Sequence, residues 1–160
     1  MKRLVASLLA AGLLACSPQP AAEASPSAQA GEPARHPVSG LAVVPLTVTT
    51  AAGPRRFMVE IAASPAEQQK GLMFRTAMGP DEGMIFPNAV PQQRSFWMKN
   101  TVIPLDIIYI GPDRRVLNIV HGEPYNETSL PSAGPVINVL EIPAGRSAAL
   151  GIKPGDAVAW

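Results

Sequence analysis

Proline is the residue that most constrains the fold of this chain. Thirteen of its 18 prolines follow residue 40, where they divide the sequence into short segments. Because proline has no backbone N–H and a restricted φ, it breaks helices and is confined to the edges and bends of sheets. We therefore expect short strands joined by rigid, irregular connections rather than by helical crossovers.

Short apolar runs between these prolines carry a strand pattern. Apolar residues alternate from Phe57 to Ile61 within residues 55–63, and a second run covers residues 41–50 on the other side of the turn-like AAGP. The two runs predict a hairpin, with Pro45 at an edge or a bulge. Further strands are expected at residues 83–86, 95–98, 105–110, 115–121, 136–142 and 156–160.

One short helix is predicted between these strands. Ser64 and Glu67 form a capping-box pattern with Pro65 in the first helical position, and Gly71 supplies a stop, so the helix should run from Pro65 to Lys70. The rest of the chain has no repeat and no helical period. This pattern predicts a single mainly β domain over residues 41–160, either an antiparallel β-sandwich of jelly-roll character or a partly open barrel.

The first 15 residues have the composition of an export signal. Lys2 and Arg3 precede an apolar run that is shorter than the about 20 residues needed to span a bilayer. Cys16, the only cysteine, ends the tetrad LLAC, which resembles the bacterial lipobox. We predict a lipoprotein signal peptide in residues 1–15 and lipidation of Cys16. An ordinary signal peptide followed by a chance cysteine is the alternative.

A tether is predicted after the signal peptide. Residues 17–40 are rich in Pro, Ala and Ser and hold almost no large apolar side chain, so residues 16–40 should form a disordered tether in which His36 is solvated. Acylation would anchor the chain to a membrane of the bacterial cell envelope, facing the periplasm. Ser17, rather than Asp, after the cysteine favours the outer membrane of a Gram-negative cell.

Charge argues against nucleic acid as a partner. Removal of residues 1–15 leaves 13 − 2 = 11 basic side chains against 12 acidic ones, a net charge of −1. The basic residues are also scattered, whereas nucleic-acid-binding domains carry a basic stripe or patch. The expected partners are therefore the membrane, through the lipid anchor, and a small-molecule or envelope ligand.

Five sequence blocks resemble a known family. They are GLMFR (71–75), DEGMIF (81–86), SFWMKNTVIPLDIIYI (95–110), VLEIPAG (139–145) and GIKPGDAV (151–158). Together they resemble the bacterial and archaeal domain of unknown function 192, also known as uncharacterised protein family 0127. The resemblance implies a compact, frequently exported β-domain without a settled activity. Many members carry a cysteine pair before the VLEIPAG block; this chain has none there, so a redox role does not carry over.

The segment SFWMKNTVIPLD places polar groups among apolar ones. On a strand, Trp97 and Lys99 share one face, and Asp106 opens a run that is apolar on both faces, so Asp106 should be buried. A buried carboxylate must be paired or hydrogen-bonded. The candidate partners are Lys99, Arg75 and the turn amides of Asn100 and Thr101.

Two interpretations of these polar residues stay open. In the first, Asp106 is purely structural and stabilises the turn at Asn100 and Thr101. In the second, a cleft suited to an anionic or sugar-like ligand is lined by Arg75, Trp97, Lys99, Asn100, Asp106 and Glu141. The second interpretation makes the domain a ligand-binding or accessory module of the envelope.

Two other functions are considered beside binding. Asp106 and Glu141 are a candidate acid and base for a hydrolase acting on an envelope glycan. The thioethers of Met58, Met73, Met78, Met84 and Met98 are candidate copper ligands, although methionine also fills irregular cores. No Ser-His-Asp or Cys-His set occurs in the sequence, so an enzyme is ranked below a binding module, with no cofactor and no metal site expected.

Overall fold

The computed structural model describes residues 33–160. The predicted signal peptide, Cys16 and most of the predicted tether lie outside the described residues. Within them, neither helix is long and apolar enough to cross a membrane.

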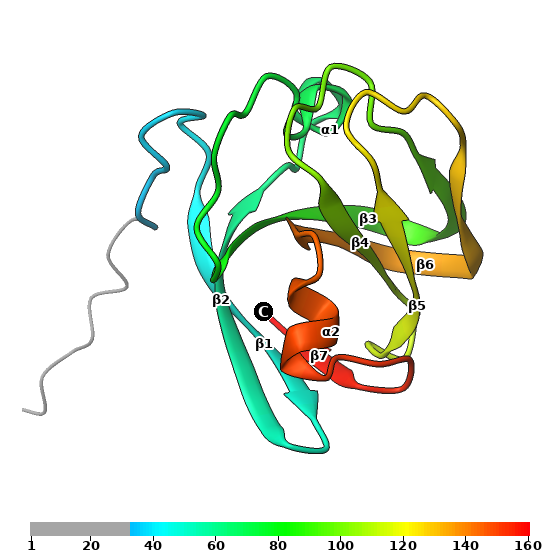
Figure 1. Ribbon diagram of the computed structural model, residues 1–160. Helices are drawn as coiled ribbons and strands as arrows, with labels where there is room; N and C mark the ends of the chain where they lie inside the picture. Colours follow the sequence, from blue (N-terminus) through cyan, green and yellow to red (C-terminus); the bar gives the residue numbers. More distant parts are fainter. Residues whose placement is uncertain (1–32) are drawn as a thin grey trace, which may run out of the picture. The chain divides into compact units, whose positions relative to one another are not determined.

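Seven strands form one strongly curled sheet, a half-barrel (Figure 1). The strands are β1 (Val43–Thr50), β2 (Gly53–Ile61), β3 (Glu82–Phe96), β4 (Leu105–Ile110), β5 (Val116–Gly122), β6 (Leu130–Pro143) and β7 (Ala157–Ala159). The sheet order is β5-β4-β6-β3-β2-β1-β7. The helices are α1 (Pro65–Lys70) and α2 (Arg146–Leu150).

The two edge strands of the sheet approach each other at one point. β7 pairs with β1, and Ala157 also forms a bridge with Arg115, just before β5. The amide of Val158 donates to the carbonyl of Arg114 at 2.8 Å. Few ladder bonds cross this seam, so closure is partial. The expectation of a mainly β fold with a partly open barrel is confirmed.

One strand pair departs from the predicted antiparallel arrangement. β2 and β3 run parallel, with Val59 opposite Gly83, and their connection contains α1. The expectation that no helix would serve as a crossover is therefore wrong here. Pro65 is compatible with the helix because it lies in the first turn. Backbone N–H groups there have no acceptor within the helix, so the missing N–H of proline removes no hydrogen bond.

β3 is longer than predicted and joins two expected strands. The segments 83–86 and 95–98 are the ends of one 15-residue strand, with register shifts between Pro87 and Gln92 and between Gln93 and Ser95. These irregularities absorb prolines that a regular ladder excludes. The strand ends at Phe96, so Trp97 and Met98 lie in the loop that follows it.

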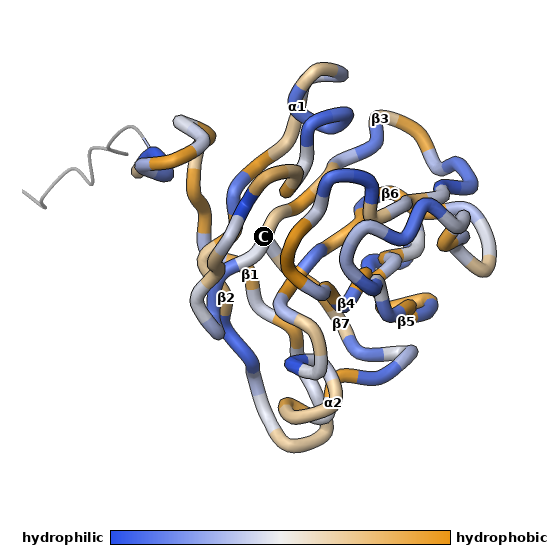
Figure 2. The backbone as a smooth tube through the Cα atoms, turned by 45° about the horizontal axis from the view of Figure 1, so that its top comes forward, coloured by the Kyte–Doolittle hydropathy of each residue, from blue (hydrophilic) through white to orange (hydrophobic). Residues whose placement is uncertain are grey.

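The sheet buries a core on each of its faces. Ile108 and Ile142 belong to the core on the α2 side, whereas Ile107 and Val139 belong to the core on the α1 side. All six residues of β4 are buried, which explains why LDIIYI is apolar on both faces. Figure 2 shows hydrophobic residues recurring along the strands.

Helix α1 forms where the sequence predicts it. The hydroxyl of Ser64 accepts the amide of Glu67 at 3.3 Å, and the carboxylate of Glu67 accepts the amide of Ser64 at 2.7 Å. Hydrogen bonds to the Glu67 carboxylate, first that from the Ser64 amide and then that from the Ser64 side chain, lower the pKa of Glu67. Helix α2 was not predicted, because its N-cap is Gly145 in a left-handed conformation, which provides no side-chain cap.

Asp106 provides the missing cap from another strand. It is buried, as expected, and its carboxylate accepts the amide of Gly145 at 3.1 Å and the amide and hydroxyl of Ser147 at 2.9 and 2.5 Å. His121 Nδ1 lies 3.5 Å from the same carboxylate. The prediction that Asp106 pairs with Lys99, Arg75 or the turn amides is therefore wrong. Side chains alternate between the two faces along β4, and Asp106 lies on the face that carries α2.

The last residues of the predicted tether contact the sheet. The amide of Val43 donates to the carbonyl of Ala34 at 2.7 Å, and the amide of His36 donates to the carbonyl of Leu41 at 2.9 Å. The side chain of His36 is only 16% exposed and faces Glu60 on β2. The expectation of a solvated His36 is therefore wrong.

We expect Asp106→Ala to lower the free energy of unfolding by about 2 kcal/mol, because three donors at the start of α2 lose their acceptor. Chemical denaturation measures the change. The matched control is Glu127→Ala, which removes an exposed carboxylate from a loop. Equal denaturation midpoints for Asp106→Ala and the wild type would contradict a structural role for Asp106.

Candidate functional site: three hollows beside helix α1

Three adjoining hollows lie along α1 and the loop that follows it. We name them the inner hollow (about 130 Å³), the outer hollow (about 430 Å³) and the N-terminal hollow (about 420 Å³). Lys70 and Met73 line all three, and Trp97 lines both the inner and the outer hollow. The last turn of α1 is therefore a wall common to the three hollows.

The inner hollow ends on a buried carboxyl group. Glu141 lies opposite Met84 of β3 and Ile107 of β4, so its side chain projects from the α1 face of the sheet. The backbones of β3 and β6 are very close here: a Cβ on Gly83 would lie 2.7 Å from the carbonyl oxygen of Glu141. This close approach explains why the DEGMIF block has glycine at position 83, because any side chain there would clash with the backbone of Glu141.

Glu141 is buried without a protein partner. Its exposed fraction is 4%, and no residue in the range 33–160 forms a hydrogen bond or ion pair with its side chain. Burial raises the pKa of Glu141 to about 8. The group is therefore protonated at neutral pH. Phe86, Phe96 and Leu72 are among the apolar residues that line the same hollow.

Arg94 is a fixed cation beside the inner hollow. Its guanidinium donates to the side-chain oxygens of Asn88 at 2.7 Å and Gln68 at 3.2 Å. The guanidinium carbon also lies 5.5 Å from the centroid of the Phe96 ring. These contacts hold the charge in place with part of its hydrogen-bonding capacity already used.

The outer hollow is flanked by an exposed aromatic ring and a lysine. Trp97 is 49% exposed, and Lys99 Nζ lies 5.2 Å from its ring centroid. The predicted neighbourhood of Trp97 and Lys99 is thus observed, although both residues lie in a loop rather than on a strand. Asn100, the third predicted residue of this segment, lines the same hollow.

The loops around the outer hollow are held in an unusual backbone conformation. Phe74 and Asn100 both have positive φ, 63° and 53°, and the amide of Phe74 donates to the carbonyl of Asn100 at 2.8 Å. Left-handed backbone costs energy for a residue with a side chain, so it persists only where surrounding contacts impose it. The Phe74–Asn100 hydrogen bond therefore ties the loop after α1 to the loop after β3 beside this hollow.

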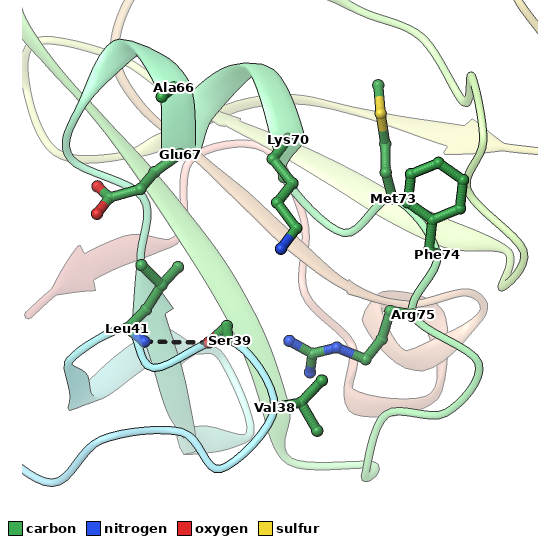
Figure 3. Close-up of a pocket in the computed structure, with 10 residues that line it drawn as sticks. Val38, Ser39, Leu41, Ala66, Glu67, Lys70, Met73, Phe74 and Arg75 are labelled. Atoms are coloured by element: carbon green, nitrogen blue, oxygen red, sulfur yellow. Dashed lines mark hydrogen bonds between the residues drawn. The ribbon is translucent and has the colours of Figure 1, made fainter.

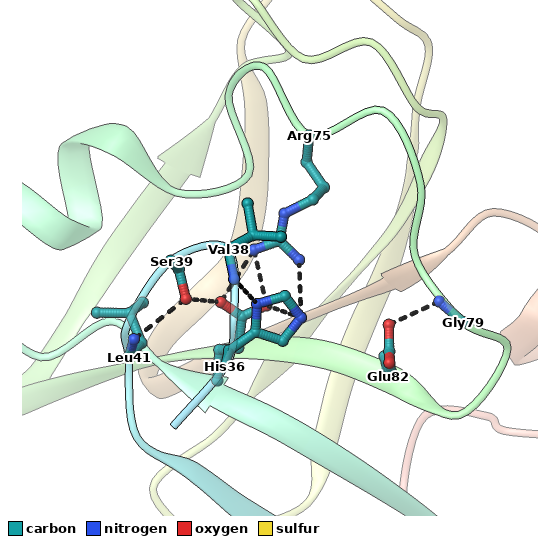
Figure 4. Close-up of polar contacts among 8 residues, drawn as sticks. His36, Val38, Ser39, Leu41, Arg75, Gly79 and Glu82 are labelled. Carbon is teal, nitrogen blue, oxygen red and sulfur yellow. Dashed lines mark hydrogen bonds and ion pairs between the residues drawn. The ribbon is translucent and has the colours of Figure 1, made fainter. Parts of the chain in front are cut away.

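The N-terminal hollow contains the remaining predicted cation, Arg75. Its Nη2 contacts both carboxylate oxygens of Glu60, at 2.9 and 3.0 Å. Ser39 also donates to this carboxylate, and His36 Nε2 lies 3.7 Å from it (Figure 4). Figure 3 shows the Lys70 side chain extending into this hollow toward Arg75.

The structure brings four of the six predicted cleft residues together. Trp97, Lys99, Asn100 and Glu141 line the inner or the outer hollow, and Arg75 lines the N-terminal hollow. Asp106 lies apart on the opposite face of the sheet, because it pairs with Ile142 while Glu141 pairs with Ile107. The two carboxyl groups therefore cannot act together on one bond, and the hydrolase that requires this pair is not supported.

Sequence reasoning did not single out Lys70, Arg94 or Glu60 as site residues. Lys70 is the last residue of the predicted helix, directly before Gly71. This position could have indicated that its side chain lies at the end of α1, beside the loop that follows. Glu60 alternates with apolar residues and resembles a solvent-facing position, yet β2 is an interior strand that buries it beside Arg75. No pattern in the sequence marked Arg94, because it lies in the irregular half of β3.

The methionines are distributed mainly as packing residues. Met84 and Met98 are fully buried in the core of the α1 face, and Met78 packs against it. Met58 is exposed on β2, whereas Met73 lines the hollows. Across residues 33–160, no group of three or more His, Cys, Asp or Glu side chains could hold a metal ion. These positions favour core packing over copper binding.

Together, the curled sheet and its hollowed, helix-covered face define a mainly β half-barrel domain with a candidate binding site. The chain belongs to the DUF192 family, described as "Uncharacterized ACR", which matches residues 46–160. No curated protein matches it.

Two solved structures are similar to this chain. A protein of unknown function from Novosphingobium aromaticivorans DSM 12444 is 57% identical, with a TM-score of 0.79 over 86% of this chain and 99% of that one. A protein from Sinorhizobium meliloti 1021, described as a "putative transcription regulator", is 36% identical, with a TM-score of 0.72 over 74% of this chain and 94% of that one.

The buried acid makes a pH-dependent contribution to stability. Between pH 4.5, its ordinary pKa, and about pH 8, Glu141 keeps a proton in the folded protein that the unfolded chain releases. The free energy of unfolding therefore falls as pH rises through this range and levels off above it. We expect Glu141→Gln to gain stability relative to the wild type over this range, by an amount on the order of a few kcal/mol.

Urea denaturation at pH 5, 6, 7 and 8 measures this difference. Glu127→Gln is the matched control because Glu127 lies on the surface. A difference between Glu141→Gln and the wild type that stays constant across the four pH values would contradict a buried, protonated Glu141.

Proposed function

We propose that this protein is a lipid-anchored binding module of the bacterial cell envelope whose domain binds a small acidic sugar. The observation that carries the proposal is the position of Trp97. Its half-exposed ring lies between the inner and outer hollows, with Lys70 in the walls of both and Lys99 against the ring. A flat aromatic face beside lysines is suited to a ring-shaped ligand that carries an anion.

The charge around these two hollows favours an anion. Lys70, Lys99 and Arg94 line them, and Glu141, the one acidic residue that residues 33–160 contribute to their walls, is neutral at pH 7. The Arg75 cation next to them is already neutralised by Glu60. Lysine ammonium groups can therefore pair with a ligand carboxylate without competition from an acidic neighbour in the same walls.

Polar side chains beside Trp97 match the hydroxyl groups of a sugar. Gln69 lines both hollows and Asn100 lines the outer one, and each amide can donate and accept hydrogen bonds. Lys99 occupies one face of the indole ring, a contact worth about 0.5–1 kcal/mol at an exposed site. A carboxylate can draw this lysine away at low cost and expose the ring face for stacking.

The envelope part of the proposal rests on the sequence. The apolar run before Cys16 and the LLAC tetrad support export and acylation, and the Pro-rich segment after them supports a spacer between anchor and domain. A binding module held near a membrane surface by such a spacer would sample ligands of the cell wall or periplasm.

Ligand binding should be visible in the fluorescence of Trp97. The chain has two tryptophans, so Trp160→Phe leaves Trp97 as the only reporter. We expect glucuronate, added to the full-length protein in a detergent without a sugar headgroup, to change this emission saturably. Glucose, which lacks the carboxylate, should bind at least tenfold more weakly, because one charge-assisted contact is worth about 1.5 kcal/mol or more.

Matched lysine variants test the site. Lys99→Ala should weaken glucuronate binding about tenfold, whereas Lys153→Ala, which removes an exposed lysine near the C-terminus, should leave it unchanged. Equal affinity for glucuronate and glucose, or equal losses in the two lysine variants, would exclude a specific anion site in these hollows.

Lipidation is tested separately from binding. We expect Cys16 to incorporate an alkyne-tagged fatty acid in a Gram-negative host and the protein to fractionate with the outer membrane. Cys16→Ala should abolish both labelling and fractionation with the outer membrane, because both require the acylated cysteine. A Cys16→Ala protein that still fractionates with the outer membrane would overturn the proposed anchor.

A further inference from the structure

We propose that Glu141 is the specificity group of the inner hollow: its carboxyl donates one hydrogen bond to, and accepts one from, an acetamido group on the ligand. The preferred ligand class is then an N-acetylated acidic amino sugar. This inference rests on the proposed function and adds to it the chemistry of one ligand substituent and a dependence of binding on one proton.

The first observation is a polar side chain without a partner. Glu141 is more than nine-tenths buried, and no described residue hydrogen-bonds to its carboxyl group. Buried polar groups in folded proteins are nearly always hydrogen-bonded to protein, water or ligand. Because Glu141 lines the inner hollow, the missing partner is supplied from that space.

The second observation concerns the charged and titratable groups around Glu141. Lys70 of α1 and Arg94 of β3 line the same hollow, and neither forms an ion pair with Glu141. Arg94 is bound to Asn88 and Gln68, and Tyr109 of β4 donates its hydroxyl to the carbonyl of Leu130. Asp106 of β4 lies on the other face of the sheet.

Without a paired cation, burial sets the protonation of Glu141. Its pKa is raised to about 8, so the carboxyl carries its proton at neutral pH. A protonated carboxyl has one O–H donor and one carbonyl acceptor side by side. A secondary amide presents the complementary acceptor and donor, and the two groups can form a pair of hydrogen bonds.

The size and lining of the inner hollow agree with an acetamido group. Its volume of about 130 Å³ is much smaller than that of the outer hollow, about 430 Å³. Phe86, Phe96 and Leu72 line the same hollow as the carboxyl and offer an apolar contact for the acetyl methyl group. The sugar ring would remain at Trp97, between the two hollows, with its anion at the lysines of the outer hollow.

Two sugar phosphates that differ only at this substituent test the inference. N-acetylglucosamine 6-phosphate carries an acetamido group where glucose 6-phosphate carries a hydroxyl, and both are anionic. By isothermal titration calorimetry with the full-length protein in detergent at pH 7, we expect the N-acetylated probe to bind at least tenfold more tightly. Glu141→Leu, which has no hydrogen-bonding group, should bind the two probes equally.

The pH dependence provides the second readout. Only the protonated carboxyl donates, so the affinity of the wild type for the N-acetylated probe should fall about tenfold between pH 7 and pH 9. Glu141→Gln keeps a donor and an acceptor but does not titrate, so its affinity should not change over this range. Asp113→Asn, a control in the β4–β5 turn, should show the wild-type decrease.

Each outcome distinguishes the two proposals. Tight binding of both probes at pH 7 without preference, or wild-type binding that does not change between pH 7 and pH 9, overturns the role of Glu141 and leaves the anion site standing. If neither probe binds at pH 7 although glucuronate does, the role of Glu141 is overturned and the anion site stands. If neither probe binds and glucuronate does not bind either, the proposed function is overturned and, with it, this inference.

Discussion

The central ladder between β3, β6 and β4 is the interaction on which the rest of the structure depends. β6 pairs along both of its edges, so its alternating residues supply apolar side chains to both cores at once. The contact of Gly83 with the carbonyl of Glu141 sets the separation of β3 and β6. Both helices depend on this ladder: α2 begins three residues after β6, and α1 lies over its opposite face.

The same ladder places two acidic side chains in the interior, where burial disfavours a charged carboxylate. Asp106 and Glu141 lie on neighbouring strands and are equally buried, yet they are satisfied in opposite ways. Asp106 receives three donors from the start of α2, so its charge is stabilised within the protein. Glu141 receives no donor from the described part of the chain and is held neutral by burial. The hydrogen-bonding capacity of Asp106 is used within the fold, whereas that of Glu141 remains available to a ligand.

Local patterns in the sequence predicted the local structure well. The capping box of α1, the β1–β2 hairpin and the two-sided burial of β4 each depend on residues close together in the chain, and each is present in the structure. The sequence could not show that β2 and β3 run parallel or that Asp106 caps α2, because both depend on pairing between distant segments. The placement of Asp106 and Glu141 on opposite faces needed the register of β4 against β6, which no local pattern contains.

The short N-terminal segment that pairs with the start of β1 has a consequence for local stability. Ala34 and Val43 are joined across a tight turn, and the side chain of His36 reaches the Glu60–Arg75 pair. The contacts that hold this segment to the sheet are therefore few and lie close together in the chain. These bonds are far fewer than those of the β1–β2 ladder, so local opening of this segment costs less free energy than opening of the hairpin.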